Sequence, residues 1–290
     1  MGCWAIGGNE FGNSYGPVRD EDSVRAVKRA LALGCTFFDT ADVYGHGHSE
    51  ELLGLALRMV RERVWIATKG GGAYMYGSRW GEINFSEEYL RFALDRSLER
   101  LRTSYVDLYQ LHNPSLKLIR EGEIFRPLRK LQEEGKIRFV GVSVHSLEEG
   151  ITALDHVDAV QCVFNILNPK NYEMMETAKR RGVAVIVREP LVNGLAAGTH
   201  GRERRFEEGD IRARMPAQYR EAIIGMMEEV RTRFSHRPEG LAQIALKYVL
   251  SFDCVTAVIP GAKTPEQVEE NLGASEIPPL TDQELAVFGS

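Results

Sequence analysis

The most informative stretch of the chain is Phe38-Asp39-Thr40-Ala41-Asp42-Val43-Tyr44-Gly45. It continues the β-branched and aromatic run Cys35-Thr36-Phe37-Phe38, which is typical of a strand. The strand brings the carboxylate of Asp39, and five residues later the phenol of Tyr44, into a loop. A phenol has an ordinary pKa of roughly 10, so it becomes a useful acid only beside a cation.

The next two predicted strands supply that cation and an imidazole. Lys69 ends Val64-Trp65-Ile66-Ala67-Thr68-Lys69, and His112 ends Leu108-Tyr109-Gln110-Leu111-His112. The carboxyl ends of parallel strands meet at one edge of a sheet, so we expect these side chains to gather there with Asp39 and Tyr44.

Composition excludes several classes of protein. A net charge of −5 and a pI near 5.9 argue against a nucleic-acid binder or a polybasic membrane protein. No apolar run approaches the roughly 20 residues of a membrane helix, and the start of the chain lacks a signal-peptide pattern. The cysteines are far apart with no C-x-x-C spacing, so we expect reduced thiols, no metal site and a cytoplasmic location. They are Cys3, Cys35, Cys162 and Cys254.

Strand-like and helix-like segments alternate along the chain. Strands are expected near 1–5, 35–40, 63–69, 105–112, 137–144, 158–164, 183–189 and 254–260. Helices are expected near 20–33, 48–60, 86–102, 123–134, 146–155, 170–181, 216–234, 238–252 and 264–274. An open doubly wound sheet fits this alternation, but eight units at this length favour a (β/α)8 TIM barrel. We expect residues 1–290 to form one such domain.

The chain resembles the aldo-keto reductases, in the bacterial-type branch that is related to potassium-channel β subunits. The resemblance rests on motifs in a fixed order along nearly the whole chain. They are Phe38-Asp39-Thr40-Ala41-x-x-Tyr44-Gly45, Ala67-Thr68-Lys69, Leu108-Tyr109-Gln110-Leu111-His112, Gly141-Val142-Ser143, Gln161-x-x-Phe164-Asn165, Pro190-Leu191-x-x-Gly194-Leu195 and Ile259-Pro260-Gly261-Ala262-Lys263. It implies a (β/α)8 barrel that binds NADP(H) without a G-x-G-x-x-G fingerprint, here without the family's N-terminal hairpin.

The resemblance also implies a catalytic tetrad at Asp39, Tyr44, Lys69 and His112. Tyr44 is expected to be the general acid, with Lys69 lowering the pKa of its phenol by roughly 1–3. Asp39 would keep Lys69 charged, and His112 would donate a hydrogen bond to the carbonyl oxygen of the substrate.

The cofactor contacts that the resemblance implies match the family at some positions and depart from it at others. Ser143 and Gln161 match the positions that hold the nicotinamide carboxamide, while Val144 replaces a frequent asparagine. Arg188 occupies the position of an aromatic residue that stacks on the nicotinamide; its guanidinium can stack instead, or form a salt bridge with Glu189. The expected contacts are Cys3, Trp4, Ser143, Gln161, Arg188, Pro190, Leu191, Gly194, Gly261, Lys263, Gln267, Glu270 and Asn271.

The segment after the last predicted strand resembles an anion site. Thr264 is expected to cap a helix, with Pro265 in its first position and Gln267 completing a capping box. Lys263 is suited to the cofactor's 2′-phosphate, although many relatives carry arginine where Gln267 stands. Glu270 and Asn271 match the family's adenine contacts.

Two loops leave alternatives open. The aromatics of residues 70–80 can form a substrate wall or pack over the barrel rim. Residues 192–215 read as a solvated loop, or as a flap over a bound anion that uses Arg202, Arg204 or Arg205.

The sequence thus predicts an enzyme that reduces small aldehydes or ketones with NADP(H), with NAD(H) possible. The alternative is a nicotinamide-binding regulatory or partner-binding module like the channel subunits. Neither nucleic acid nor membrane is expected as a partner, and the oligomeric state stays open.

Overall fold

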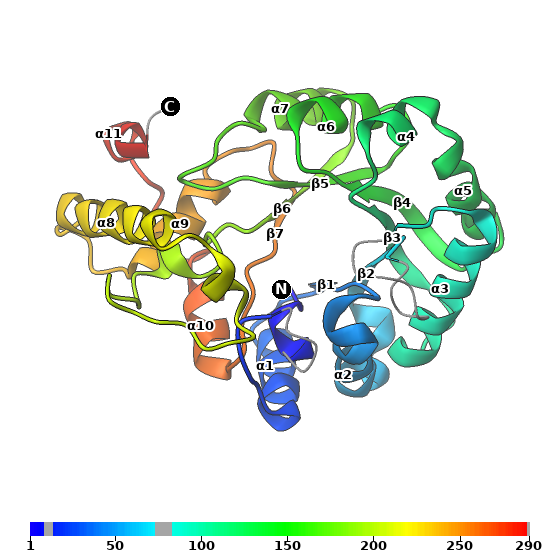
Figure 1. Ribbon diagram of the computed structural model, residues 1–290, viewed down its shortest axis with the longest axis horizontal. Coiled ribbons are helices and arrows are strands. Elements are labelled where there is room, and N and C mark those ends of the chain that lie inside the picture. Colours follow the sequence, from blue (N-terminus) through cyan, green and yellow to red (C-terminus); the bar gives the residue numbers. More distant parts are fainter. Residues whose placement is uncertain (9–13, 73–82, 289–290) are drawn as a thin grey trace.

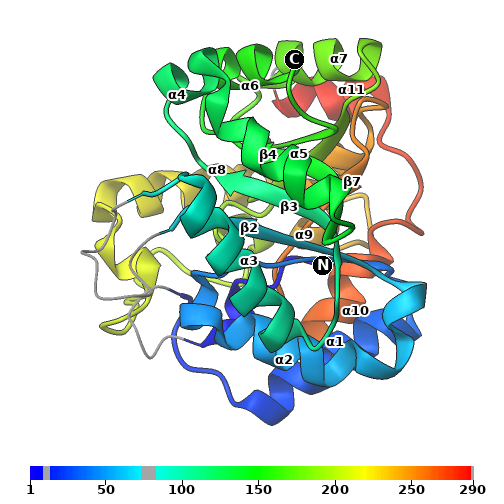
Figure 2. The same ribbon diagram turned by 90° about the vertical axis from the view of Figure 1, so that its right-hand side faces the viewer.

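The computed structural model describes residues 1–8, 14–72 and 83–288. The described residues form one parallel seven-stranded sheet whose strands are neighbours in chain order. The strands are β1 Phe37–Asp39, β2 Trp65–Gly70, β3 Val106–His112, β4 Ile137–Ser143, β5 Ala159–Val163, β6 Ala184–Arg188 and β7 Ala257–Val258. The sheet curls, with the helices on its outer side (Figure 1), and the side view shows β2, β3 and β4 lying next to one another (Figure 2).

Helices connect the strands, as the alternation predicts. The α-helices are α1 Asp20–Ala32, α2 His48–Leu57, α3 Glu87–Leu101, α4 Leu116–Glu121, α5 Arg126–Glu133, α6 Leu147–Ala153, α7 Tyr172–Arg180, α8 Ala217–Arg233, α9 Leu241–Leu250, α10 Pro265–Gly273 and α11 Asp282–Leu285. The short helices α4 and α11 were not expected from the sequence. No helix in the described part of the chain is long and apolar enough to cross a membrane.

The strand expected at 1–5 is wrong as a strand. Gly2 instead makes isolated parallel bridges to Asp39 and to Gly261, and a 3-10 helix, η1 Ala5–Gly7, follows at once. The Gly2 amide donates to the Pro260 carbonyl at 2.9 Å. A Cβ atom on Gly2 would lie 2.6 Å from the Ile259 carbonyl oxygen, so only glycine permits this approach. One residue therefore joins the two edges of the sheet, without a strand ladder.

Helix α3 shows how local sequence builds these elements. The Ser86 hydroxyl accepts from the Tyr89 amide at 3.3 Å, and two glutamates occupy the first turn, where the helix dipole favours negative charge. The leucines predicted to share one face are all buried. They are Leu90, Leu94, Leu98 and Leu101.

Alternation along the strands places polar side chains at one end of the sheet's inner face. Successive strand residues point to opposite faces, so residues two apart share a face. A small apolar cluster fills the deeper inward positions: Ala67, Leu108, Ala159, Ile186 and Ile259. The same rows continue two residues later with Lys69, Gln110, Gln161 and Arg188. The strands β2, β3, β5 and β6 therefore each deliver a polar side chain near their carboxyl ends.

The contact between α2 and α3 depends on Gly54. A Cβ atom there would lie 2.3 Å from the Arg100 carbonyl oxygen, so we expect Gly54→Ala to lower the free energy of unfolding by about 1–3 kcal/mol. Gly225 in α8 is the matched control, because its added methyl would meet only the movable Arg202 side chain at 3.3 Å. Gly225→Ala should be neutral or stabilising by up to about 1 kcal/mol. Denaturant unfolding of both variants measures the difference; equal stabilities would contradict the close packing.

Candidate active site

The site is built around the buried ammonium group of Lys69. Its Nζ atom donates to Asp39 Oδ1 at 2.6 Å, to the Thr40 carbonyl at 2.8 Å and to the Tyr44 hydroxyl oxygen at 3.0 Å. An ammonium group has three hydrogens, and these three acceptors use all of them. The Tyr44 oxygen therefore accepts a hydrogen bond from Lys69 and keeps its own hydrogen free for another partner.

Buried hydrogen bonds also fix the carboxylate of Asp39. Its second oxygen, Oδ2, accepts from Gln161 Nε2 at 2.7 Å and from Gln110 Nε2 at 3.1 Å. Both amides lie on the inner face of the sheet and are fully buried. Gln110 was not predicted as a site residue, although its place two residues before His112 puts it on the same face.

The pKa values of the pair follow from burial and from each other. Burial alone would lower the pKa of Lys69, but Asp39 and Tyr44 outweigh it, so the net direction is upward and the ammonium stays charged. Burial raises the pKa of Tyr44, and the nearby Lys69 offsets only part of that rise. Lys69 thus lowers the pKa of Tyr44 as expected, but removal from water has the larger effect, so the net direction is upward.

His112 ends β3 beside the phenol. Its ring lies edge-on to that of Tyr44, with centroids 6.0 Å apart. Burial, with the positive charges of Lys69 and Arg188, holds the pKa of His112 well below its ordinary value. The imidazole is therefore neutral near pH 7 and can donate one N–H hydrogen bond.

The turn after Tyr44 depends on a glycine. Gly45 has φ +58°, and a Cβ atom there would lie 2.2 Å from the Gly7 carbonyl oxygen. The short helix η1 and the turn that carries the phenol thus pack backbone to backbone.

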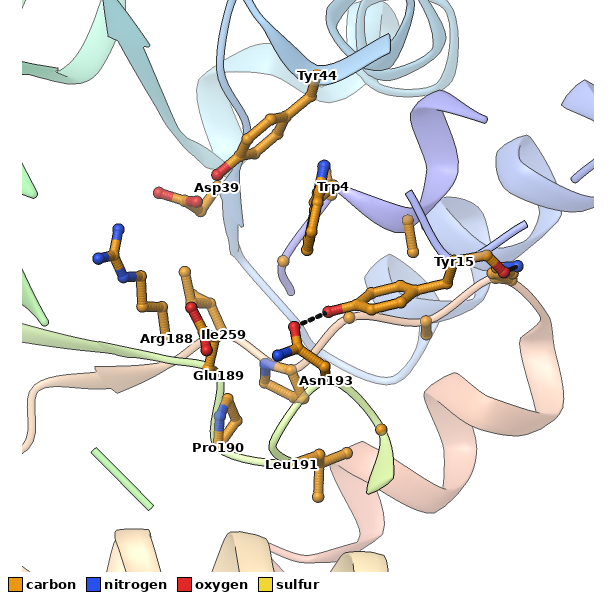
Figure 3. Close-up of a pocket in the computed structure, with 18 of the residues that line it drawn as sticks. Trp4, Tyr15, Asp39, Tyr44, Arg188, Glu189, Pro190, Leu191, Asn193 and Ile259 are labelled. Carbon is orange, nitrogen blue, oxygen red and sulfur yellow. Dashed lines mark hydrogen bonds between the residues drawn. The ribbon is translucent and has the colours of Figure 1, made fainter. Parts of the chain in front are cut away.

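A cavity of about 760 Å³ opens over these groups at the carboxyl ends of the strands (Figure 3). Asp39, Tyr44 and His112 line it, and Lys69 lies buried beneath. Of the predicted cofactor contacts, those on its wall are Cys3, Trp4, Gln161, Arg188, Pro190, Leu191, Gly194, Gly261, Lys263, Gln267, Glu270 and Asn271. Ser143 is fully buried, and its hydroxyl donates to Asn113 Oδ1 at 2.9 Å, with Asn113 on the wall.

Three buried polar atoms on the cavity wall have no hydrogen-bond partner among the described residues. They are the Trp4 indole nitrogen, Gln161 Oε1 and Arg188 Nε. An unpaired buried polar atom is costly, so each is suited to a ligand. Gln161 Oε1 in particular is the acceptor that a carboxamide NH2 group needs.

Arg188 does not form the alternative salt bridge with Glu189 in the described structure. Its guanidinium donates to Asn113 Oδ1 at 3.0 Å, to the Val144 carbonyl at 3.0 Å and to His145 Nδ1 at 3.1 Å. Figure 3 shows it pointing toward the Asp39 and Tyr44 side of the cavity.

The far end of the cavity differs in detail from the expected capping box. Thr264 caps α10 through its bond from the Gln267 amide, but Gln267 Oε1 accepts from the Lys263 amide, one residue before the cap, at 2.8 Å. The Lys263 ammonium donates to the backbone carbonyls of Tyr15 and Gly16. A phosphate at this end would have to share Lys263 with those carbonyls.

Sequence reasoning missed the residues that join Lys263 to the opposite wall. The Tyr15 hydroxyl donates to Asn193 Oδ1 at 2.8 Å, shown as the dashed line in Figure 3. The Arg212 guanidinium lies 5.0 Å from the Tyr15 ring centroid and is paired with Asp210 at 2.7 Å. The contact joins segments nearly two hundred residues apart, so no local pattern announces it.

The structure decides part of what the sequence left open for the loops at 192–215 and 70–80. Arg202 is exposed and pairs with Glu228 of α8, while Arg204 and Arg205 are exposed; Arg212 is the arginine of this loop that lines the cavity. Tyr74, Tyr76 and Trp80 of the other loop lie outside the described residues, whereas Gly72 and Ile83 on either side line the cavity.

Comparison with known proteins identifies a family. A family model described as "Aldo/keto reductase family" matches residues 5–289. L-galactose dehydrogenase of Arabidopsis thaliana is 31% identical over 284 residues, which cover 93% of this chain and 82% of that protein. The NADH-specific methylglyoxal reductase of Escherichia coli is 30% identical, covering 96% and 89%.

A solved structure is similar as well. The aldo/keto reductase from Klebsiella pneumoniae in complex with NADP and acetate superposes with a TM-score of 0.75 at 25% identity, covering 99% of this chain and 88% of that one.

The ionisation of His112 can be measured directly. We expect its ring to stay neutral from pH 8 down past 6.5, whereas His48 should titrate above 6.5, because hydrogen bonds to Asp20 and Glu51 outweigh the effect of its partial burial. Unfolding returns His112 to its ordinary pKa, so the unfolded chain binds an extra proton below pH 6.5 and the free energy of unfolding falls as pH drops. Long-range 1H–15N spectra of the imidazoles measure both pKa values; a His112 midpoint above 6.5 would contradict the assignment.

Proposed function

Since the chain belongs to the aldo/keto reductase family, we propose that it reduces aldehyde or ketone carbonyls to alcohols with Tyr44 as the general acid. One observation carries this proposal. Lys69 Nζ donates its third hydrogen to the Tyr44 hydroxyl oxygen at 3.0 Å. The phenol hydrogen therefore remains available at the cavity wall. A carbonyl oxygen in hydrogen-bond reach of Tyr44 receives that hydrogen as negative charge develops on it.

The groups around Tyr44 assist it as the one proton donor of the proposed reaction. Lys69 stabilises the tyrosinate left after proton transfer, and Asp39 keeps the ammonium charged and in place. His112 is neutral, so it serves as a hydrogen-bond donor that orients and polarises the carbonyl group. Oxidation of an alcohol would use the same groups in reverse.

The family uses NADP(H), and an NADH-specific relative is consistent with use of NAD(H) as well. When bound, the reduced cofactor supplies the hydride that reaches the carbonyl carbon. Gln161 Oε1 would accept from the carboxamide, and Arg188 would lie beside the nicotinamide ring. Further contacts would come from the Pro190–Gly194 segment and, at the opposite end of the cavity, from Gly261, Lys263, Gln267, Glu270 and Asn271.

The same proposal extends to the architecture. We treat residues 1–290 as one (β/α)8 domain in which the residues around Gly2 take the place of the eighth strand. A cytoplasmic location suits the free cysteines and the expected cofactor. No observation favours the alternative of a regulatory module.

Replacing the phenol tests the proposal. We expect Tyr44→Phe to lower kcat for carbonyl reduction by roughly 10²- to 10⁴-fold, because the proton donor is lost, while the Kd for NADPH stays within about threefold. A panel of aldehydes and ketones with NADPH and NADH, followed by loss of absorbance, gives the rates.

The control is Tyr105→Phe. Tyr105 precedes β3 at the end away from the cavity, with its hydroxyl bonded to Glu62, so its rates should match those of the wild type. A Tyr44→Phe enzyme as fast as wild type would refute the assignment of the general acid.

A further inference from the structure

Arg188 is a cation without a charged partner in the described structure. Its three hydrogen-bond acceptors are an amide oxygen, a backbone carbonyl and an imidazole nitrogen, all of them neutral. His145 accepts from the guanidinium at Nδ1, and its pKa is lowered first by burial and then by Arg188. Three acceptors from two separate segments hold this charge in one position.

The surrounding groups do not cancel the charge. Asp39 and Lys69 neutralise each other at 2.6 Å, and His112 is neutral. The neighbouring Glu189 is exposed, with φ +55°, and no ion pair joins it to Arg188 among the described residues. Glu189 also lines the cavity, but it is exposed to solvent, which screens its charge, whereas hydrogen bonds hold the Arg188 guanidinium in place.

Strand register places this charge relative to the unpaired acceptor of Gln161. Gln161 pairs with Ile186, so Arg188 lies two residues farther toward the cavity mouth on the same face, a rise of roughly 6.6 Å. A nicotinamide ring whose carboxamide is held at Gln161 Oε1 would therefore lie on this face of the sheet, next to the guanidinium.

We propose that Arg188 makes the site discriminate between the two redox states of its cofactor, binding the reduced form more tightly than the oxidised form. This inference rests on the proposed function. Loss of a hydride leaves the nicotinamide ring with a positive charge, whereas the reduced ring is neutral. A fixed cation beside the ring therefore repels only the oxidised form. The guanidinium plane can still lie against the neutral ring.

Two consequences follow for the reaction. The equilibrium between the two bound redox states shifts toward the reduced cofactor. Carbonyl reduction in the ternary complex is therefore less favourable than in solution. In exchange, the oxidised cofactor leaves faster, and release of product is a common limit on kcat. Arg188 would thus act on turnover through cofactor release, as a positioning and electrostatic residue without a role in proton transfer.

Calorimetric Kd values for NADPH and NADP+ test the proposal without turnover. The phosphates and adenosine are the same in both forms, so their contacts cancel in the ratio of the two Kd values. We expect the wild type to favour NADPH and Arg188→Gln to reduce that preference by about tenfold, mainly through tighter NADP+ binding. Arg188→Lys keeps the charge and should retain most of the preference. Stopped-flow release of NADP+ should be slower in Arg188→Gln.

Arg212→Gln is the matched control. Arg212 also lines the cavity, but it is paired with Asp210 and contacts His200 and Tyr15 instead of the tetrad. Its loss should change both Kd values by the same factor. Circular dichroism and thermal unfolding confirm that each variant is folded.

The possible results distinguish failure of this inference from failure of the proposed function. Equal preference in wild type and Arg188→Gln, or a wild type that binds NADP+ as tightly as NADPH, overturns the inference while the proposed reductase function stands. Loss of the preference in Arg188→Lys as well as Arg188→Gln overturns a role for charge. A wild type that binds neither nucleotide overturns the proposed function together with the inference.

Discussion

The buried charge of Lys69 is the constraint on which the rest of the site depends. An ammonium group removed from water is very unfavourable unless acceptors surround it. Asp39 and the Thr40 carbonyl supply two of them from the end of β1, and the Tyr44 hydroxyl supplies the third. The residues Asp39–Tyr44 must therefore wrap around the end of β2. Neutralising one lysine thus brings the carboxylate of Asp39 and the phenol of Tyr44 to the same place.

Much of this arrangement could be predicted because it is local or periodic. The tetrad residues lie at or just beyond the ends of strands that the sequence marks clearly, and parallel pairing brings those ends together without further information. The failures have physical causes. Residues 1–5 look like a strand but form bridges at Gly2 alone, because Trp4 already has helical backbone angles and the 3-10 helix η1 begins at Ala5. The direction of the Tyr44 pKa depends on whether burial or Lys69 dominates, which composition and spacing do not reveal.

The end of the cavity around Lys263 was less predictable, because its contacts join distant segments. Arg212, Tyr15 and Asn193 meet across the cavity, and Lys263 is engaged by the carbonyls of Tyr15 and Gly16. None of these partners is implied by a neighbour in sequence. The two arginines on the cavity wall therefore differ: Arg212 is compensated by Asp210, whereas the hydrogen-bond partners of Arg188 are neutral.

The single bridge at Gly2 also bears on how the molecule assembles. Each strand of the sheet pairs with the strand before it, so most of the sheet can form through contacts of modest sequence separation. The bridge between Gly2 and Gly261 instead closes a loop of nearly the whole chain, and such contacts form late because loop closure is entropically costly. Asp39, which donates its amide to the Met1 carbonyl and accepts from the Cys3 amide, lies at that seam. The backbone of Asp39 therefore reaches its final surroundings only when the two ends of the chain meet, whereas its carboxylate can already pair with Lys69 once β1 and β2 have joined.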